Sequence, residues 1–212
     1  MPVKIKQRHL KHAKVNIKEL KITLRAKFRG MREEMPATKK KVWDASICHN
    51  LLRLREYQEN DTIFLYVSKD IEVNTYPIIQ KALGHGKRVA VPLCIPGTYL
   101  MEFYYIRGEQ DLEPGSFGVM EPVVSQCEKV QDLSHGLCVV PGFSFDAKGF
   151  RLGYGKGYYD RFLSSFGGFT AGICYANCIQ WNLPHGYYDR PVDVLVTENY
   201  IRRTATRPSK KG

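Results

Sequence analysis

Apolar residues recur at every third or fourth position between residues 17 and 35, which is the first clear pattern along the chain. This spacing forms one apolar side on an α-helix, so we expect a helix packed against a core. Asn16 can cap its start, Glu19 occupies the reciprocal capping position, and Pro36 ends it. The apolar positions that predict the helix are Ile17, Leu20, Leu24, Phe28, Met31 and Met35.

A stripe of basic residues lies one position after the apolar stripe, at Lys21, Arg25, Arg29 and Arg32. At about 100° per residue these side chains flank the edge of the apolar side. Long basic side chains can lie along apolar surface while their charged ends reach further. We therefore expect their heads to reach a ligand held beside the core.

Beyond a second amphipathic helix, which starts after Thr38, apolar runs alternate with helical segments. Continuous apolar runs such as residues 62–67 are typical of strands buried on both faces. A helix is expected from Asn74 or Thr75 to Gly84, and another over residues 157–166. Strands are expected at 62–67, 88–94, 100–106, 137–141, 169–175 and 193–197. This alternation predicts one α/β domain, residues 16–201, with a mainly parallel sheet and helices on both faces.

The net charge of +11 at pH 7 is concentrated at the two ends of the chain. Residues 1–41 carry fourteen Lys and Arg against three Glu, whereas residues 42–201 carry thirteen bases against eighteen acids. We expect residues 1–15 to be a disordered basic arm and residues 202–212 to be a basic tail. Basic ends can bind polyanions, which leaves a nucleic-acid-binding protein as an alternative. The acidic body, however, offers no basic platform for nucleic acid.

The sequence contains no clear membrane-spanning segment, signal peptide or cysteine motif. No apolar run approaches the roughly 18 residues needed to cross a bilayer, and no signal-peptide pattern follows the start. The six cysteines are scattered and form no C-x-x-C pair, which favours buried, reduced thiols over a zinc site. We therefore expect a cytoplasmic protein without a membrane partner. The basic, acid-free start leaves import into an organelle open, although its many lysines, single arginine and lack of serine are unlike a mitochondrial presequence.

The candidate chemistry lies in the run FRLGYGKGYYD, residues 150–160, which leads from a strand into a helix. Its glycines let backbone N–H groups approach a ligand closely, and the helix start adds free N–H donors. Arg151 and Lys156 supply positive charge suited to phosphate. In a parallel sheet this loop opens on the same rim as residues 68–74, where ligands of such sheets bind. The alternative to a phosphate-binding loop is a flexible surface turn without a ligand.

Asp160 ends this run, although a carboxylate about 4 Å from a phosphate oxygen is repelled by about 4 kcal/mol at an effective dielectric of 20. A divalent cation between the two groups reverses the repulsion. Mg²⁺ takes one or two carboxylates together with phosphate oxygens and water. Asp189 and Asp193, before the last expected strand, are candidates for the second carboxylate.

Several motifs together resemble one known family. In chain order they are K-x-x-L-R from Lys21, S-x-x-x-E-V-x-T from Ser68, VPG-x-x-F, RLGYGKGYYD-R-x-L and D-x-x-VD-x-LVTE. This order is similar to that of the 5-formyltetrahydrofolate cyclo-ligases, also called methenyltetrahydrofolate synthetases, over roughly Lys21 to Glu198. The resemblance implies an α/β fold similar to ribose-phosphate isomerases and CoA transferases.

The resemblance also assigns roles to individual residues. ATP binding is implied for Lys21, Arg25, Arg151, Leu152, Gly153, Tyr154, Gly155, Lys156, Gly157, Tyr158 and Tyr159. Folate binding is implied for Val67, Glu72, Tyr154, Gly155, Lys156, Gly157 and Tyr158, and metal binding for Asp160 and Asp189. We expect Arg151, Lys156 and Tyr158 to be catalytic. A carboxylate at Glu72 suits a pterin, because its 2-amino-4-oxopyrimidine edge offers paired N–H donors.

The implied activity is ATP- and Mg²⁺-dependent conversion of 5-formyltetrahydrofolate to 5,10-methenyltetrahydrofolate, with release of ADP and phosphate. We expect a monomer that takes folate with or without a polyglutamate tail. We further expect ATP to phosphorylate the formyl oxygen before N10 closes the ring. Another phosphate-ligand enzyme of the same fold is the remaining alternative.

Overall fold

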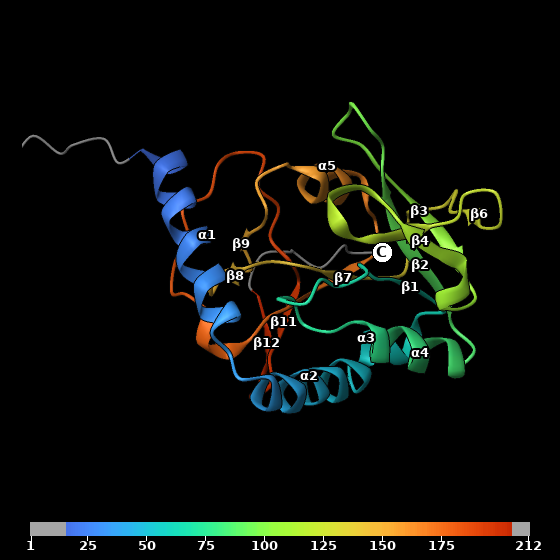
Figure 1. Ribbon diagram of the computed structural model, residues 1–212, viewed down its shortest axis with the longest axis horizontal. Coiled ribbons are helices and arrows are strands. Elements are labelled where there is room, and N and C mark those ends of the chain that lie inside the picture. Colours follow the sequence, from blue (N-terminus) through green and yellow to red (C-terminus); the bar gives the residue numbers. More distant parts are fainter. Residues whose placement is uncertain (1–15, 205–212) are drawn as a thin grey trace, which may run out of the picture.

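One eight-stranded sheet forms the centre of the fold in the computed structural model, which describes residues 16–204 (Figure 1). The strand order is β12-β11-β10-β7-β1-β2-β3-β6. These strands are β1 (Thr62–Phe64), β2 (Arg88–Cys94), β3 (Met101–Ile106), β6 (Glu128–Lys129), β7 (Leu137–Val140), β10 (Phe169–Ile173), β11 (Val194–Val196) and β12 (Ile201–Arg203). The expected arm, residues 1–15, and residues 205–212 of the expected tail lie outside the described residues.

The sheet is mixed but mostly parallel, as the alternation of strands and helices predicts. Strands β11, β10, β7, β1 and β2 run parallel to one another. Strand β12 is antiparallel to β11, β3 to β2, and β6 to β3. The short connection from β2 to β3 explains one reversal, because only antiparallel neighbours can be joined by a tight turn. The expected α/β class is confirmed.

Helices cover both faces of the sheet. Figure 1 shows α2 (Ala37–Leu52), α3 (Arg55–Glu59) and α4 (Tyr76–Gly84) along one side and α5 (Tyr158–Ser165) on the other. Helix α1 (Ile17–Glu33) stands at one end, beside the short pair β8 (Ser144–Phe145) and β9 (Arg151–Leu152). A second small pair, β4 (Leu112–Pro114) with β5 (Met120–Pro122), lies at the opposite end.

Helix α1 begins as its sequence predicts, because the Asn16 side chain accepts hydrogen bonds from the backbone N–H groups of Lys18 and Glu19. Its apolar stripe is buried only in part. Phe28 is fully buried, whereas Ile17 is 48% exposed. The outer half of α1 therefore packs against no core, and the reason is the cavity that it borders.

The expectation for Arg32 is wrong. Its guanidinium is buried and donates hydrogen bonds to the carbonyl oxygens of Gly142 (2.5 Å) and Phe143 (3.0 Å), with the Cys174 Sγ at 3.5 Å. These bonds hold the loop after β7 against α1. A basic stripe on a helix cannot tell a ligand contact from an internal one, because the periodicity of both is the same.

Five of the six expected strands are shorter than expected, and the largest difference is at β1. Strand β1 ends at Phe64, although residues 65–67 remain buried and the N–H of Leu65 still donates to the carbonyl of Ala90. Residues 65–67 are therefore apolar because they are buried, not because they belong to a hydrogen-bonded strand. Strand β12 extends the sheet to Arg203, past the expected domain end at residue 201.

All six cysteines fall within the described residues and carry free thiols, four of them buried and Cys94 and Cys127 half-buried. Within residues 16–204, moreover, every helix is too short or too polar to cross a bilayer.

Candidate functional site

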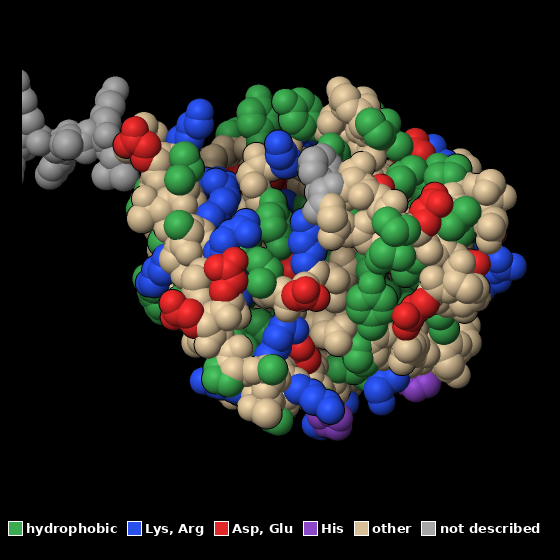
Figure 2. Space-filling model, viewed as in Figure 1, with side chains coloured by type: hydrophobic (Ala, Val, Ile, Leu, Met, Phe, Trp, Pro, Cys, Tyr) green, Lys and Arg blue, Asp and Glu red, His purple; other side chains and the backbone are tan. Residues whose placement is uncertain are grey.

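A cavity of about 1370 Å³ opens at the rim of the sheet where the loops after β1 and β7 emerge. Its walls come from α1, the loop after β1, the turn between β9 and α5, residues 188–190 and strand β5. Figure 2 shows Lys and Arg side chains gathered on the α1 side of this face. Every residue to which the family resemblance assigns a role lines this cavity: Lys21, Arg25, Val67, Glu72, Arg151, Leu152, Gly153, Tyr154, Gly155, Lys156, Gly157, Tyr158, Tyr159, Asp160 and Asp189.

The α1 wall presents two bases one helical turn apart. Lys21 Nζ lies 2.5 Å from an Asp189 carboxylate oxygen, and both side chains are about one-fifth exposed. Arg25 Nε donates to the carbonyl oxygen of Gly153 at 2.7 Å. Arg25 thereby ties α1 to the glycine-rich turn, and Lys21 ties it to the loop before β11. The α1 wall thus links three segments far apart in the sequence.

The glycine-rich turn needs two of its glycines for backbone reasons. Gly155 has φ +89° and Gly157, which caps α5, has φ +78°; both are in the left-handed region. A Cβ at Gly155 would lie 3.0 Å from the Arg25 guanidinium carbon, closer than side chains normally approach. Gly155 therefore allows the guanidinium to lie directly on the turn.

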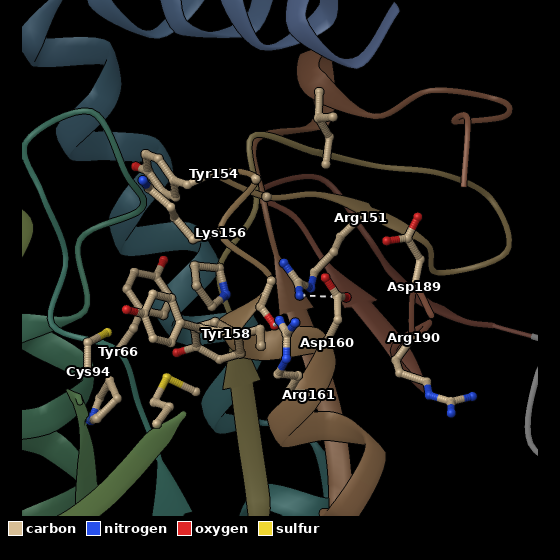
Figure 3. A pocket seen from close by; sticks show the side chains of 18 of the residues that line it. Tyr66, Cys94, Arg151, Tyr154, Lys156, Tyr158, Asp160, Arg161, Asp189 and Arg190 are labelled. Atoms are coloured by element: carbon tan, nitrogen blue, oxygen red, sulfur yellow. Dashed lines mark hydrogen bonds and ion pairs between the residues drawn. The ribbon is translucent and has the colours of Figure 1, made fainter. Parts of the chain in front are cut away.

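Arg151 and Asp160 face each other across this turn. Arg151 Nη2 donates to Asp160 Oδ1 at 2.8 Å (Figure 3), and only 7% of the Arg151 side chain is exposed. The Arg151 Nε is buried and, within the described part of the chain, has no hydrogen-bond partner. A buried N–H donor without a partner is uncommon and calls for an explanation. Lys156 stands at the exposed mouth of the cavity.

Glu72 is the buried carboxylate of the cavity. One oxygen accepts from the Lys69 backbone N–H (2.9 Å), and the other accepts from the Tyr154 hydroxyl (3.0 Å). Burial raises the pKa of Glu72, and these hydrogen bonds oppose the rise. Since Tyr154 belongs to the glycine-rich turn, this bond confirms that the loops after β1 and β7 meet at one rim.

Sequence reasoning missed part of the apolar wall of the cavity. Pro92 and Met101 come from the expected strands β2 and β3, but Val119 and Met120 lie at the start of β5, in a connection that its glycines and prolines made look like a plain loop. Glu121, which is buried, accepts from the backbone N–H groups of Cys94 (3.4 Å) and Ser116 (2.9 Å) and so fixes β5 beside β2. The apolar lining residues are Tyr66, Val67, Pro92, Met101, Val119 and Met120.

The candidate metal residues are each paired with a base. Asp160 meets Arg151 and Asp189 meets Lys21. Although burial works in the opposite direction, hydrogen bonds from Lys21 and the Gly186 N–H lower the pKa of Asp189, so it is ionised at neutral pH. Among the residues that the structure describes, no three His, Cys, Asp or Glu side chains gather as a metal cage.

Asp193, the other candidate for the second carboxylate, lies away from the cavity lining. One of its oxygens accepts from both the N–H (2.8 Å) and the hydroxyl (2.7 Å) of Thr170. Asp193 therefore joins the starts of β10 and β11.

Comparisons with known proteins agree with this geometry. The model of the 5-formyltetrahydrofolate cyclo-ligase family matches residues 17–198. The chain is 33% identical to a probable 5-formyltetrahydrofolate cyclo-ligase of Schizosaccharomyces pombe, over 74% of this chain and 85% of the relative. It is 31% identical to the 5-formyltetrahydrofolate cyclo-ligase of Haemophilus influenzae, over 82% of this chain and 95% of the relative.

Solved structures resemble it as well. The 5,10-methenyltetrahydrofolate synthetase of Aquifex aeolicus superposes with a TM-score of 0.77 at 32% identity, covering 91% of this chain and 97% of the other. A Mycoplasma pneumoniae enzyme of the same name reaches a TM-score of 0.67 at 22% identity, covering 84% of this chain and 98% of the other, which shows the fold alone.

Proposed function

Because the chain belongs to the 5-formyltetrahydrofolate cyclo-ligase family, we propose that its one large cavity holds ATP and the folate together. The chain converts 5-formyltetrahydrofolate to 5,10-methenyltetrahydrofolate in an ATP-dependent reaction. The observation that carries the proposal is the convergence of all the family-matched residues on a single cavity. A nucleic-acid function of the basic ends has no comparable support.

ATP lies along the α1 wall in this proposal. Lys21, Arg25, Arg151 and Lys156 all line this side, and a chain of phosphates needs such separated positive charges. The backbone of the glycine-rich turn allows close approach, and the N-terminus of α5 favours an anion. The unpaired Arg151 Nε supports an oxygen ligand beside the turn, because a bound phosphate oxygen would satisfy it.

The folate lies along the apolar wall. The aminobenzoyl ring of 5-formyltetrahydrofolate is flat and mostly apolar, which fits a wall of Pro92, Met101, Val119 and Met120. Glu72 provides the directional contact, since its carboxylate can accept from paired N–H donors of the pterin. The Tyr154 hydroxyl, which now donates to Glu72, orients that carboxylate.

The carboxylates fit Mg²⁺ as ATP would bring it. Mg²⁺ uses one or two protein carboxylates and takes its other ligands from phosphate and water. Asp160 and Asp189 would hold it, and the ion would neutralise negative charge on the phosphates. Each carboxylate now pairs with a base that the proposal assigns to phosphate. Bound Mg·ATP would provide both members of each pair with a new partner.

The chemistry requires activation of a poor leaving group. The formyl oxygen attacks the γ-phosphorus of ATP, an O–P bond forms, and the bond to the ADP oxygen breaks. N10 then attacks the formyl carbon, the C–O bond breaks with departure of phosphate, and N10 releases its proton. The protein's residues contribute position and charge: Arg151 and Lys156 stabilise the transferring group, and Tyr158 borders both substrates.

The direct test mixes the purified protein with ATP, Mg²⁺ and 5-formyltetrahydrofolate and follows methenyl absorbance and ADP. We expect one ADP for each methenyl product and no turnover when either substrate is left out. ADP release that does not depend on folate would favour another phosphate-ligand enzyme. A folded protein that forms neither product would contradict the proposal.

A further inference from the structure

The Tyr159 hydroxyl is a buried donor without an acceptor among residues 16–204. Within residues 16–204 four buried side-chain N or O atoms lack a hydrogen-bond partner: Arg32 Nε, Arg151 Nε, Tyr159 Oη and Glu198 Oε1. Only Arg151 and Tyr159 line the cavity. Arg151 still donates through Nη2 to Asp160, whereas the hydroxyl is the whole polar group of Tyr159. A buried polar group without a partner is destabilising, so its retention calls for a reason.

Tyr159 lines the cavity at the start of α5. It sits in the first turn of α5, between Tyr158 and Asp160. Figure 3 shows Arg151 and Asp189 on one side of this helix start and Tyr66 and Cys94 on the other. The Arg151 guanidinium carbon is 5.4 Å from the centre of the Tyr159 ring. The Tyr159 ring is therefore a neighbour of the Arg151 guanidinium, which the proposed function assigns to phosphate.

The unpaired Arg151 Nε makes an oxygen the fitting partner. Two donors on residues in contact with each other, one N–H and one O–H, are both without an acceptor and both belong to the cavity wall. An oxygen-rich group between them would satisfy both. Catalytic hydrogen bonds are often incomplete without substrate and tighten when it binds. The left-handed Gly157 at the start of α5 gives the turn the freedom to make that adjustment.

We infer that Tyr159 is a catalytic residue whose hydroxyl, together with Arg151 Nε, donates to the oxygens of the phosphoryl group as it passes to the formyl oxygen. This inference rests on the proposed function. The bond strengthens as charge develops on those oxygens, so its contribution falls on the chemical step rather than on substrate binding. The hydroxyl forms no covalent bond and keeps its proton throughout.

The test is Tyr159→Phe, which removes the hydroxyl alone. We expect the single-turnover rate of methenyl formation to fall by about 10²-fold to 10³-fold, the usual loss for one donor to a developing oxyanion. Dissociation constants for a non-hydrolysable ATP analogue and for 5-formyltetrahydrofolate should stay within about twofold. The melting temperature should stay the same or rise, because an unpaired buried hydroxyl disappears.

Tyr57→Phe is the matched control. Tyr57 is fully buried, and its hydroxyl bonds to Nδ1 of His85, the residue after α4, at 2.9 Å and outside the cavity lining. The control should melt at a lower temperature and retain the wild-type rate. An unchanged rate in Tyr159→Phe would overturn the inference, as would a rate loss matched by weaker ATP binding or by a lower melting temperature. Failure of the wild-type protein to form product would instead count against the proposed function.

Discussion

At the scale of single residues, each predicted metal ligand is paired with a predicted phosphate ligand. Arg151 bonds Asp160 and Lys21 bonds Asp189, at distances of 2.8 and 2.5 Å. The glycines, bases and terminal carboxylate of residues 150–160 singled out Arg151 and Asp160, and the family resemblance implied the roles of Lys21 and Asp189. The sequence could not name Tyr159 as a donor without a partner, since satisfaction of a hydroxyl depends on tertiary neighbours.

Glu72 gives a pH prediction with a definite sign. Burial raises its pKa above the ordinary 4.5, so between that value and the raised one the native protein holds a proton that the unfolded chain has released. The free energy of unfolding must then fall as the pH rises through this window. We expect Glu72→Gln to remove this part of the slope in denaturant unfolding at a series of pH values.

Glu113→Gln is the control for that measurement, because Glu113 is an exposed carboxylate outside the cavity lining. It should keep the slope of the wild-type protein. If Glu72→Gln unfolds with the wild-type pH dependence, burial of Glu72 has no such consequence.

At the scale of elements, α1 works as a wall of the cavity as much as a part of the core. Its inner half packs through Phe28, and its outer half carries Lys21 and Arg25 toward the glycine-rich turn. Periodicity predicted the helix and its cap. Periodicity also predicted burial for the outer half of α1, which is partly exposed. The spacing of apolar residues is the same whether they face a core or a cavity.

Gly155→Ala tests the contact between α1 and the turn. The added Cβ would meet the Arg25 guanidinium at 3.0 Å, and alanine is strained at φ +89°. Strain of this kind costs about 1–3 kcal/mol. We expect the dissociation constant of ATP to rise about tenfold, measured by calorimetry, as Arg25 is pushed from its position.

Gly86→Ala separates strain from crowding. Gly86 has a similar φ of +73°, but nothing lies within 4 Å of a Cβ there, and it is outside the cavity lining. This variant should lose comparable stability and bind ATP like the wild-type protein. Equal ATP affinity in both variants would mean that the Arg25 contact has no part in nucleotide binding.

At the scale of the whole molecule, the position of the site follows from topology. Parallel strands β1 and β7 are neighbours, so their following loops meet at one rim. That much was predictable from alternation alone. The antiparallel edges and the β4–β5 wall were not, because short strands in a Gly- and Pro-rich connection carry little periodicity. Whether such short segments form strands depends on hydrogen bonding to partners that are distant in the sequence.

Binding of Mg·ATP should stabilise the whole protein. At 100 times its dissociation constant a ligand adds about 2.7 kcal/mol, and each kcal/mol raises the melting temperature of a protein of this size by about 2–4 °C. We expect ATP with Mg²⁺ to raise the melting temperature by about 5–10 °C in differential scanning calorimetry. EDTA should remove most of the shift.

Asp160→Asn should require more Mg²⁺ to reach the same shift, because it weakens one of the proposed ligands. Asp132→Asn, at an exposed carboxylate outside the cavity lining, should behave like the wild-type protein. If the shift in melting temperature is the same with EDTA and in Asp160→Asn, ATP binding does not involve a metal at this site, which contradicts that part of the proposal.

The most direct measurement is a crystal structure with a non-hydrolysable ATP analogue, Mg²⁺ and 5-formyltetrahydrofolate bound. We expect the phosphates within hydrogen-bonding distance of Lys21, Arg25 and Arg151, the pterin on Glu72, and the formyl oxygen facing the γ-phosphorus beside Tyr159. Both compounds bound elsewhere, or the cavity filled by its own side chains while they bind, would contradict a shared site in this cavity.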